Sequence, residues 1–481
     1  MAVPDELRKR YEAAGQGHVF KYLDAGKVPE EQKAAFLAQL TSLDLDFVTN
    51  SYRGAVEEVE QAKKAAAEGR AQSDLEPPSS FGCLEDTAPA QIAAWETEGL
   101  QAIGRGEVAA CVLAGGQGTR LGFDGPKGCY DMKFESGKSL FQIYAERVRR
   151  VVALASQAGG TASRVPLLVM TSPLNHKETV AFFEQNGHFG LPADDVWFFQ
   201  QGTLPCMTPE GKLILESAGV VATAPDGNGG FYPALQKSGC LARMQEQGIK
   251  YIHVFSVDNL LCRPADPRFA GYCIQQGADC GNKCVWKVSP EEKVGVIARR
   301  GGKSTVVEYS ELDESKKQQR DASGRLVFGA GNICNHFFSV AFLSDKVLPA
   351  MANLFHLANK KIPCADAEGL TMKPEKENGI KLEAFIFDVF TLSSNMAILE
   401  TLREEEFGPV KNAPGAATDS PETAKALLNA LGRRWIKEAG GQLSGPEEAL
   451  VEISPLLSYA GEGLEAKVKG QVIAAPSYLT P

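Results

Sequence analysis

The sequence lacks the long apolar runs of a membrane protein. None of its uncharged apolar stretches approaches the ~18 residues that a membrane-spanning helix needs. The first residues, MAVPDELRKRYEAAG, carry charges where a signal peptide has its apolar core. We therefore expect no membrane partner and a cytoplasmic location.

The sequence also lacks the cysteine and histidine patterns of a protein metal centre. Its eleven cysteines form no CxxC pair, and only Cys280 and Cys284, in CGNKC, approach metal-ligand spacing. Its six histidines form no HExxH or similar array. We expect reduced, mostly buried thiols and no Ser–His–Asp or cysteine nucleophile.

Clusters of positive charge are absent as well. The net charge is −10, and the Lys and Arg residues are scattered along the chain, which argues against a surface for nucleic acid or anionic lipid. Small-molecule partners fit this composition better. The length of 481 residues allows about three domains, with no internal repeat, and we place them at 1–100, 101–390 and 391–481.

The order of apolar patterns predicts an α/β protein with a helical N-terminal lobe. Residues 4 to about 70 have helical periodicity, 70–82 resemble a connector, and another helix surrounds QIAAWETEGLQAI. From Val108 onward, short apolar strands alternate with helices, which is typical of a doubly wound, mainly parallel sheet. The section 278–338 is rich in strands and predicts a hairpin at VGVIARRGGKSTVVEYSE, so we expect a mixed sheet. The last part combines a helix with short β-prone pieces, as in a small α+β domain.

A glycine-rich segment follows the first of these strands. The stretch LAGGQGTRLGFDGPKG, Leu113–Gly128, holds six glycines, and glycine lets backbone N–H groups approach an anion closely. It matches neither the Rossmann fingerprint nor the P-loop. Its cations, Arg120 and Lys127, suit a polyphosphate that leaves as pyrophosphate, which suggests nucleotidyl transfer. The alternative is an ordinary strand-to-helix turn with surface cations.

Asp258 stands directly after the apolar strand YIHVFSV, where α/β sheets place their sites. A carboxylate there can hold Mg²⁺ against nucleotide phosphates. The alternative is that Asp258 caps a helix.

A series of motifs resembles one known family. LAGGQGTRLG, PKGCYD, QQGTLPC, APDGNGG, FSVDN, VVEYSE, GNICNHFF, FIFDVF, EFGPVKN and EISPLLSYAGEGLE occur in this order. Together they closely resemble the eukaryotic UDP-N-acetylglucosamine pyrophosphorylases, also called UDP-N-acetylhexosamine pyrophosphorylases, from about residue 90 to about residue 465. The resemblance implies three domains, with a Rossmann-like nucleotidyltransferase fold in the centre. It also implies reversible, magnesium-dependent formation of UDP-N-acetylglucosamine and pyrophosphate from UTP and N-acetylglucosamine 1-phosphate, with Mn²⁺ as an alternative ion.

The same resemblance assigns the site residues. It implies that Arg120, Lys127 and Lys411 hold the phosphates and that Asp258 holds the metal. The nucleotide is expected on Leu113, Ala114, Gly115, Gly116, Gln201 and Gly227. The sugar is expected on Asn228, Gly295, Glu308, Asn332, Phe385 and Phe387, with the two phenylalanines near the acetyl methyl.

Five of these residues also have a plainer explanation. Phe385 and Phe387 alternate as core residues of a strand do, Glu308 resembles a solvated strand residue, and Asn332 resembles a turn residue. Lys411 lies in EFGPVKNAPG, a loop between two prolines that can close on substrates, but most lysines are simply solvated. A UDP-glucose or other UDP-sugar pyrophosphorylase and a non-catalytic UDP-sugar sensor are the rival functions. The sequence leaves open the oligomeric state and the use of N-acetylgalactosamine 1-phosphate.

Overall fold

The protein forms two compact units in the computed structural model, which describes residues 3–67 and 74–481. Unit 1 contains Met1–Ser73, Gln201–Ala234 and Lys346–Val389. Unit 2 contains Asp74–Gln200, Leu235–Asp345 and Phe390–Pro481. Unit 1 is therefore built from three separate segments, while the division into three consecutive domains stays a prediction.

Unit 2 is centred on a mixed sheet that is mainly parallel. Its strand order is β2–β19–β11–β14–β10–β3–β4–β5. The strands are β2 (Gly82–Cys83), β3 (Val108–Leu113), β4 (Leu167–Thr171), β5 (Val196–Gln200), β10 (Tyr251–Ser256), β11 (Cys280–Trp286), β14 (Ala330–Ser339) and β19 (Met396–Glu400). Only β14 on this path runs against its neighbours, β10 and β11. The predicted doubly wound α/β fold with a mixed sheet is confirmed.

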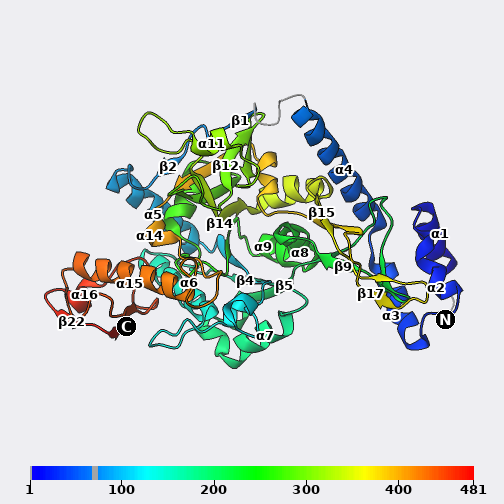
Figure 1. Ribbon diagram of the computed structural model, residues 1–481. Helices are drawn as coiled ribbons and strands as arrows, with labels where there is room; N and C mark the ends of the chain where they lie inside the picture. Colours follow the sequence, from blue (N-terminus) through cyan, green and yellow to red (C-terminus); the bar gives the residue numbers. More distant parts are fainter. Residues whose placement is uncertain (1–2, 68–73) are drawn as a thin grey trace. The chain divides into compact units, whose positions relative to one another are not determined.

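Helices cover the central strands, which explains the unbroken apolar runs. Every residue of β3 is buried, because a parallel strand inside such a sheet has both faces covered. The covering helices include α5 (Pro89–Gly104), α6 (Leu140–Gln157), α7 (His176–Gln185), α9 (Cys240–Glu246) and α10 (Pro267–Gln275). Figure 1 shows β4 and β5 beside α6 and α7, the two helices that flank β4 in the chain. Ser139 caps α6 by accepting a hydrogen bond from the Gln142 N–H at 3.2 Å.

The predicted hairpin is confirmed as β12 (Val296–Arg300) and β13 (Lys303–Val307). Its turn residues Gly301 and Gly302 have φ of 55° and 79°, values that favour glycine over any other residue. The hairpin is joined by β1 (Leu75–Glu76), which pairs antiparallel with β12. The connector predicted at 70–82 therefore supplies a strand, and its residues up to 73 lie outside the described part of the chain.

The C-terminal part of unit 2 is α+β, as predicted. It contains α14 (Arg403–Glu406), α15 (Pro421–Glu438) and α16 (Glu465–Val468), with two short parallel strand pairs. The pairs are β20 (Gln442–Ser444) with β22 (Val472–Ala474), and β21 (Val451–Ile453) with β23 (Ser477–Leu479). Ser420 and Thr423 form a capping box at the start of α15. Val410, Ala424 and Tyr459 are buried in the same apolar core as β3, so this part packs onto the sheet.

Unit 1 joins the N-terminal helices to strands from later in the chain. The helices are α1 (Asp5–Ala13), α2 (Lys21–Asp24), α3 (Glu30–Ser42) and α4 (Leu45–Ala67), and α8 (Phe231–Lys237) begins in this unit. The strand pairs are β6 (Thr203–Pro205) with β9 (Thr223–Pro225), β7 (Leu215–Ser217) with β8 (Val220–Val221), β15 (His356–Lys360) with β18 (Gly379–Glu383), and β16 (Cys364–Ala365) with β17 (Thr371–Met372). Tyr11, Phe36 and Leu40 share a buried core with Leu213 and Val221. Figure 1 shows the blue helices α1 to α3 beside β9 and β17.

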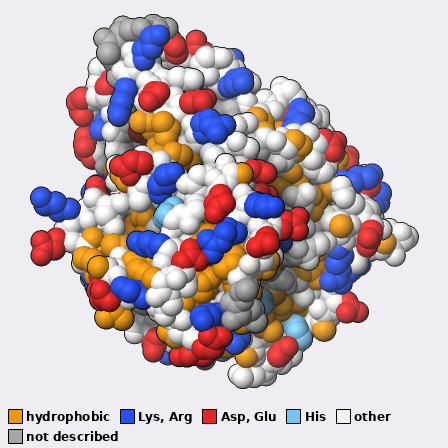
Figure 2. Space-filling model, turned by 90° about the vertical axis from the view of Figure 1, so that its right-hand side faces the viewer, with side chains coloured by type: hydrophobic (Ala, Val, Ile, Leu, Met, Phe, Trp, Pro, Cys, Tyr) orange, Lys and Arg blue, Asp and Glu red, His pale blue; other side chains and the backbone are white. Residues whose placement is uncertain are grey.

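The surface and the thiols agree with the composition. All eleven cysteines are free, and most of them are buried. No helix in residues 3–67 or 74–481 is long and apolar enough to cross a membrane. Figure 2 shows Lys and Arg side chains interspersed with Asp and Glu over the face that it draws.

Candidate active site

The glycine-rich segment leaves the carboxyl end of β3 and folds back on itself. The Lys127 N–H donates to the Gly116 carbonyl at 3.1 Å, and the Gly118 N–H donates to the Gly125 carbonyl at 2.9 Å. Gly122 has a φ of 66°, which favours glycine at this turn. A Cβ atom at Gly116 would meet no atom within 4 Å, so a ligand can approach the exposed backbone there.

A buried asparagine fixes the start of this segment. Asn175 donates from Nδ2 to the carbonyls of Ala114, at 2.9 Å, and Gly116, at 3.2 Å. Leu113 and Ala114 are buried, Gly115 is half-buried and Gly116 is exposed. The predicted nucleotide-binding backbone thus runs from the sheet interior to the surface within four residues.

Unit 2 holds an electrostatic cluster in which the charges of Asp258, Lys411 and Arg120 act on Lys127. Lys127 Nζ lies 3.8 Å from Asp258 Oδ2, and their side chains are only 15% and 16% exposed. Burial lowers the pKa of Lys127, the carboxylate of Asp258 opposes this effect, and the charges of Lys411 and Arg120 add to it. The cluster has an excess of positive charge, which suits a ligand with several negative charges.

Asp258 lies in the turn after β10 and caps no helix, so the helix-cap alternative is wrong. The Ser256 hydroxyl donates to Asp258 Oδ1 at 2.6 Å, while Oδ2 faces Lys127. Within the described residues, no three His, Cys, Asp or Glu side chains are grouped as ligands of one metal ion. One carboxylate still fits Mg²⁺ that takes its other ligands from phosphates and water.

Lys411 is presented from a loop, as its position between two prolines predicts. Its side chain is exposed, and its backbone N–H donates to the Asp419 carbonyl at 2.7 Å. The preceding residue, Val410, is fully buried and donates its N–H to the Asp258 carbonyl at 2.8 Å. The loop is therefore attached to the turn that carries Asp258.

Gly295, Glu308 and Asn332 are neighbours around the β12–β13 hairpin. The Asn332 N–H donates to the Gly295 carbonyl at 2.8 Å, and a Cβ at Gly295 would lie 3.1 Å from Glu308 Oε1. Burial raises the pKa of Glu308, Glu311 adds to the effect, and the charge of Lys411 opposes it. Glu308 is half-buried and Asn332 lies within β14, so neither the solvated-residue nor the turn explanation holds.

The remaining predicted residues form a second cluster, in unit 1. Gln201 donates from Nε2 to the Gly227 carbonyl at 2.5 Å, and Asn228 Oδ1 accepts from the Ile386 N–H at 3.0 Å. The rings of Phe385 and Phe387 stack with centroids 5.3 Å apart and an interplanar angle of 11°. Both phenylalanines follow β18 instead of lying in it, and Phe385 is 37% exposed, so they are not core residues of a strand.

Several residues that the sequence does not single out support these clusters. Asn175 donates a hydrogen bond to the glycine-rich segment, and Ser256 donates one to Asp258. Asn259 donates one to the Glu406 carbonyl, in the chain before Lys411. Asp226 is buried beside Gln201, and burial raises its pKa to about 6. Ser256, Asn259 and Asp226 each stand within two residues of a predicted ligand, but the sequence does not show where their side chains point.

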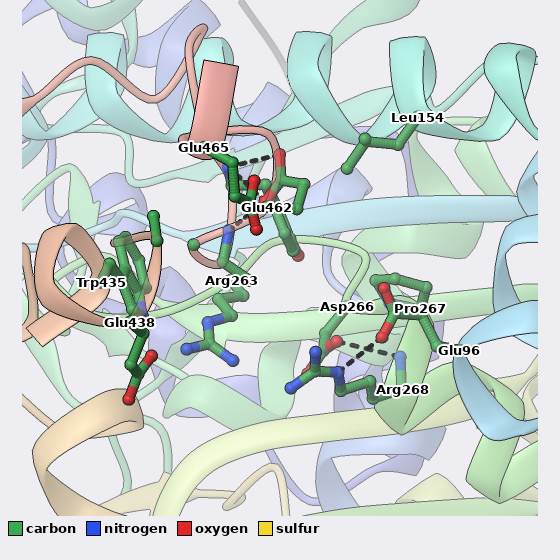
Figure 3. A pocket seen from close by; sticks show the side chains of 14 residues that line it. Glu96, Leu154, Arg263, Asp266, Pro267, Arg268, Trp435, Glu438, Glu462 and Glu465 are labelled. Carbon is green, nitrogen blue, oxygen red and sulfur yellow. Dashed lines mark hydrogen bonds and ion pairs between the residues drawn. The ribbon is translucent and has the colours of Figure 1, made fainter. Parts of the chain in front are cut away.

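A separate cavity in unit 2 contains none of the predicted site residues. Its volume is about 250 Å³, and it is lined by residues of α10, α15 and the segment around Glu462 (Figure 3). Its walls carry the carboxylates of Glu96, Asp266, Glu438, Glu462 and Glu465, against the guanidinium groups of Arg263 and Arg268. This excess of negative charge disfavours a nucleotide.

Comparison with known proteins shows the family of the chain. The UTP--glucose-1-phosphate uridylyltransferase family matches residues 84–457. The human UDP-N-acetylhexosamine pyrophosphorylase-like protein 1 is 42% identical, covering 100% of this chain and 97% of its own. UDP-N-acetylglucosamine diphosphorylase 2 of Arabidopsis thaliana is 42% identical over 98% of this chain and 93% of its own.

One solved structure is similar over the whole chain. The uridine diphosphate N-acetylglucosamine pyrophosphorylase of Trypanosoma brucei, crystallised with an inhibitor, superposes with a TM-score of 0.82 at 33% identity, covering 99% of each chain. These matches extend beyond any single motif. The chain therefore belongs to the UTP--glucose-1-phosphate uridylyltransferase family, among relatives that are UDP-N-acetylglucosamine and UDP-N-acetylhexosamine pyrophosphorylases.

Proposed function

We propose that the protein is a uridylyltransferase that forms UDP-N-acetylglucosamine and pyrophosphate from UTP and N-acetylglucosamine 1-phosphate. The observation that carries the proposal is the largely buried pair of Lys127 and Asp258, 3.8 Å apart, with the charges of Arg120 and Lys411 acting on the same ammonium group. This cluster lies at the carboxyl ends of β3 and β10, next to an open glycine-rich backbone. Relatives over the full chain length support the same chemistry.

The reaction needs positioning and charge, and no covalent intermediate with the protein. A phosphate oxygen of the sugar phosphate attacks the α-phosphorus of UTP in line, and pyrophosphate leaves on the opposite side. Lys127 and Arg120 stabilise the phosphates of UTP, and Lys411 reduces the repulsion between the two phosphate groups as they approach. Because Lys127 is largely buried, its charge acts in a medium of low dielectric constant, where it is most effective.

Asp258 is the residue that we propose to hold Mg²⁺, with Mn²⁺ as a substitute. Its hydrogen bond from Ser256 orients the carboxylate, and Lys127 limits the local negative charge. A bound divalent cation neutralises charge on the nucleotide phosphates.

Recognition of the base and the sugar is assigned to the two remaining clusters. Gln201 and Gly227 bind the uracil edge, because an amide and a backbone group match its alternating donors and acceptors. Glu308 and Asn332, beside Gly295, bind sugar hydroxyls, and Asn228 with the stacked Phe385 and Phe387 favours an acetylated sugar. Glucose 1-phosphate has no acetyl methyl for the stacked Phe385 and Phe387 to contact.

The proposed partners are small molecules, and we place the reaction in the cytoplasm. Eleven free cysteines are consistent with a reducing compartment. A non-catalytic UDP-sugar sensor is the less favoured alternative, because it would have little use for three cations around the reacting phosphates.

Initial rates of pyrophosphate release test the proposal. UTP and Mg²⁺ are combined with the 1-phosphates of N-acetylglucosamine, N-acetylgalactosamine and glucose in parallel reactions. We expect the highest kcat/KM with an N-acetylated sugar phosphate. Preference for glucose 1-phosphate would favour the rival enzyme, and binding of UDP-sugars without turnover would favour the sensor.

A further inference from the structure

We propose that Asn259 is a positioning residue for uridylyl transfer, which holds the chain before Lys411 against the turn that carries Asp258. The ammonium and the carboxylate are then set in place before substrate binds, instead of meeting when a loop closes. The inference rests on the proposed role of Lys411 in the reaction.

The Asn259 side chain forms two hydrogen bonds to one short segment. It is only 2% exposed. Its Nδ2 donates to the Glu406 carbonyl at 2.7 Å, and its Oδ1 accepts from the Gly408 N–H at 2.9 Å. Both ends of the amide are therefore used by the chain just before Lys411.

The backbone continues this attachment toward the two charged residues. Asn259 and Pro409 form an antiparallel bridge, and the Leu260 N–H donates to the Gly408 carbonyl at 2.9 Å. The next contact joins the Val410 N–H to the Asp258 carbonyl at 2.8 Å. Asp258 precedes Asn259 in the chain, and Lys411 follows Val410, so both functional side chains stand directly beside the attachment.

Buried ion pairs to Glu406 hold the same segment in place. Lys283 is fully buried, and its Nζ lies 3.0 Å from Glu406 Oε2. Arg263 Nη1 lies 3.4 Å from Glu406 Oε1, and Lys283 also pairs with Asp266. Arg263 and Asp266 are labelled in Figure 3. Moving Glu406 would separate two buried ion pairs, so the end of α14 provides a rigid base for Asn259.

Only an amide of this size satisfies both contacts. Aspartate has the same shape but no donor for the Glu406 carbonyl, and it would add a negative charge beside the proposed metal ligand. Alanine removes both contacts, while serine keeps one hydroxyl. The series Asn259→Ser, Asn259→Ala and Asn259→Asp therefore loosens the attachment in steps.

Turnover by the full-length variants tests the inference. We expect Asn259→Ala to lower kcat by roughly 10–10²-fold, because small displacements of a reacting group have effects of this size. KM for UTP should change by less than about threefold, since an interaction made chiefly in the transition state affects kcat. Asn259→Ser should retain more activity than Asn259→Ala, and it provides a readout if the alanine variant does not fold.

A double-mutant cycle separates positioning from general stabilisation. If Asn259 acts through Lys411, the Asn259→Ala change should have little further effect on kcat once Lys411→Ala is present. The inference is overturned if the fold-decreases in kcat of the two single variants multiply in the double variant. It is also overturned if folded Asn259→Ala keeps full kcat. Wild-type protein without pyrophosphate release would instead contradict the proposed function.

Asn429 offers a matched control. It is another largely buried asparagine, and it bridges α15 to the backbone of Ala449 and Val451, with contacts of 3.4 and 2.8 Å. Asn429→Ala should lower the melting temperature while leaving kcat near the wild-type value. A fall in kcat equal to that of Asn259→Ala would show that loss of any buried amide has the same effect, which would overturn the positioning role.

Discussion

Lys127 is the least exposed of the three clustered cations. Its side chain is 15% exposed, and Asp258 lies 3.8 Å away as a partial counterion. Burial removes water from the ammonium group, so a phosphate that replaces this water interacts with it more strongly.

Replacing Lys127 should therefore affect turnover more than folding. We expect Lys127→Ala to lower kcat by roughly 10²–10³, the usual effect of losing one well-placed electrostatic group. Initial rates at saturating UTP measure the effect, and circular dichroism verifies the fold. Lys437→Ala, an exposed lysine of α15, is the matched control and should keep normal rates. Normal turnover in folded Lys127→Ala would remove this residue from the site.

Asn228 and Asn332 lead to a second prediction at the residue scale. Asn228 Oδ1 accepts a hydrogen bond from the Ile386 N–H, and Asn332 Oδ1 accepts one from the Cys334 N–H. These bonds orient the two side-chain amides. Replacing either by Ala should weaken the reaction with N-acetylglucosamine 1-phosphate by roughly 1–3 kcal/mol, because a sugar polar group loses its partner. Calorimetry with UTP alone should show nearly unchanged binding. Equal weakening of UTP and sugar-phosphate binding would contradict the assignment.

Within unit 1, an ion-paired histidine connects three elements. His356, at the start of β15, lies 3.2 Å through Nδ1 from Glu58 Oε2 on α4 and 3.0 Å through Nε2 from Asp388 Oδ2. Its ring also stacks on Phe385, with centroids 5.5 Å apart. Burial opposes protonation, but the hydrogen bonds to Asp388 and Glu58 outweigh it and raise the pKa of His356 to about 10. The protonated His356 ring, paired with both carboxylates, thus packs against Phe385 of the phenylalanine pair.

Because the pKa of His356 is raised in the folded protein, we expect the free energy of unfolding to depend on pH. The folded protein binds the proton more tightly than the unfolded chain, whose histidine pKa is near 6.5. The stabilisation is fully present below pH ~6.5, and it falls as the pH rises toward 10. Urea unfolding at several pH values should show a shallower decrease for His356→Gln than for wild type. Equal slopes for wild type and His356→Gln would disprove the pairing.

At the scale of the whole molecule, the C-terminal part belongs to the core of unit 2. Val410, Ala424 and Tyr459 are at most 4% exposed, in one cluster with the residues of β3. The Tyr459 hydroxyl also donates to the Pro264 carbonyl at 3.0 Å. The region after α14 is thus part of the folding unit.

A chain that ends near residue 405 should therefore lose more than Lys411. Removing several fully buried side chains exposes the apolar surface that they cover, and each large one contributes about 1.5–3 kcal/mol. We expect the truncated protein to lack a cooperative thermal transition by circular dichroism and to be cleaved rapidly by trypsin. A truncated protein with the wild-type melting temperature would show that the sheet is stable alone.

Elements that depend only on neighbouring residues could be predicted from the sequence. The buried strands β3, β4 and β10, the hairpin around Gly301 and the open glycine-rich turn all follow from apolar runs and glycine conformations. Arg120 and Lys127 indicated nucleotidyl transfer because both lie in the glycine-rich segment, whereas the role of Lys411 came from the family resemblance of its motif, EFGPVKN.

The meeting of distant segments became visible in the folded protein. The fold placed β14 antiparallel between β10 and β11, and it built unit 1 from three separate segments. It also brought Asn259 to Glu406, 147 residues away, and His356 to Glu58 on α4. Such contacts depend on the packing of the whole chain, because a side chain's partner across a core leaves no periodic trace in the sequence near either residue.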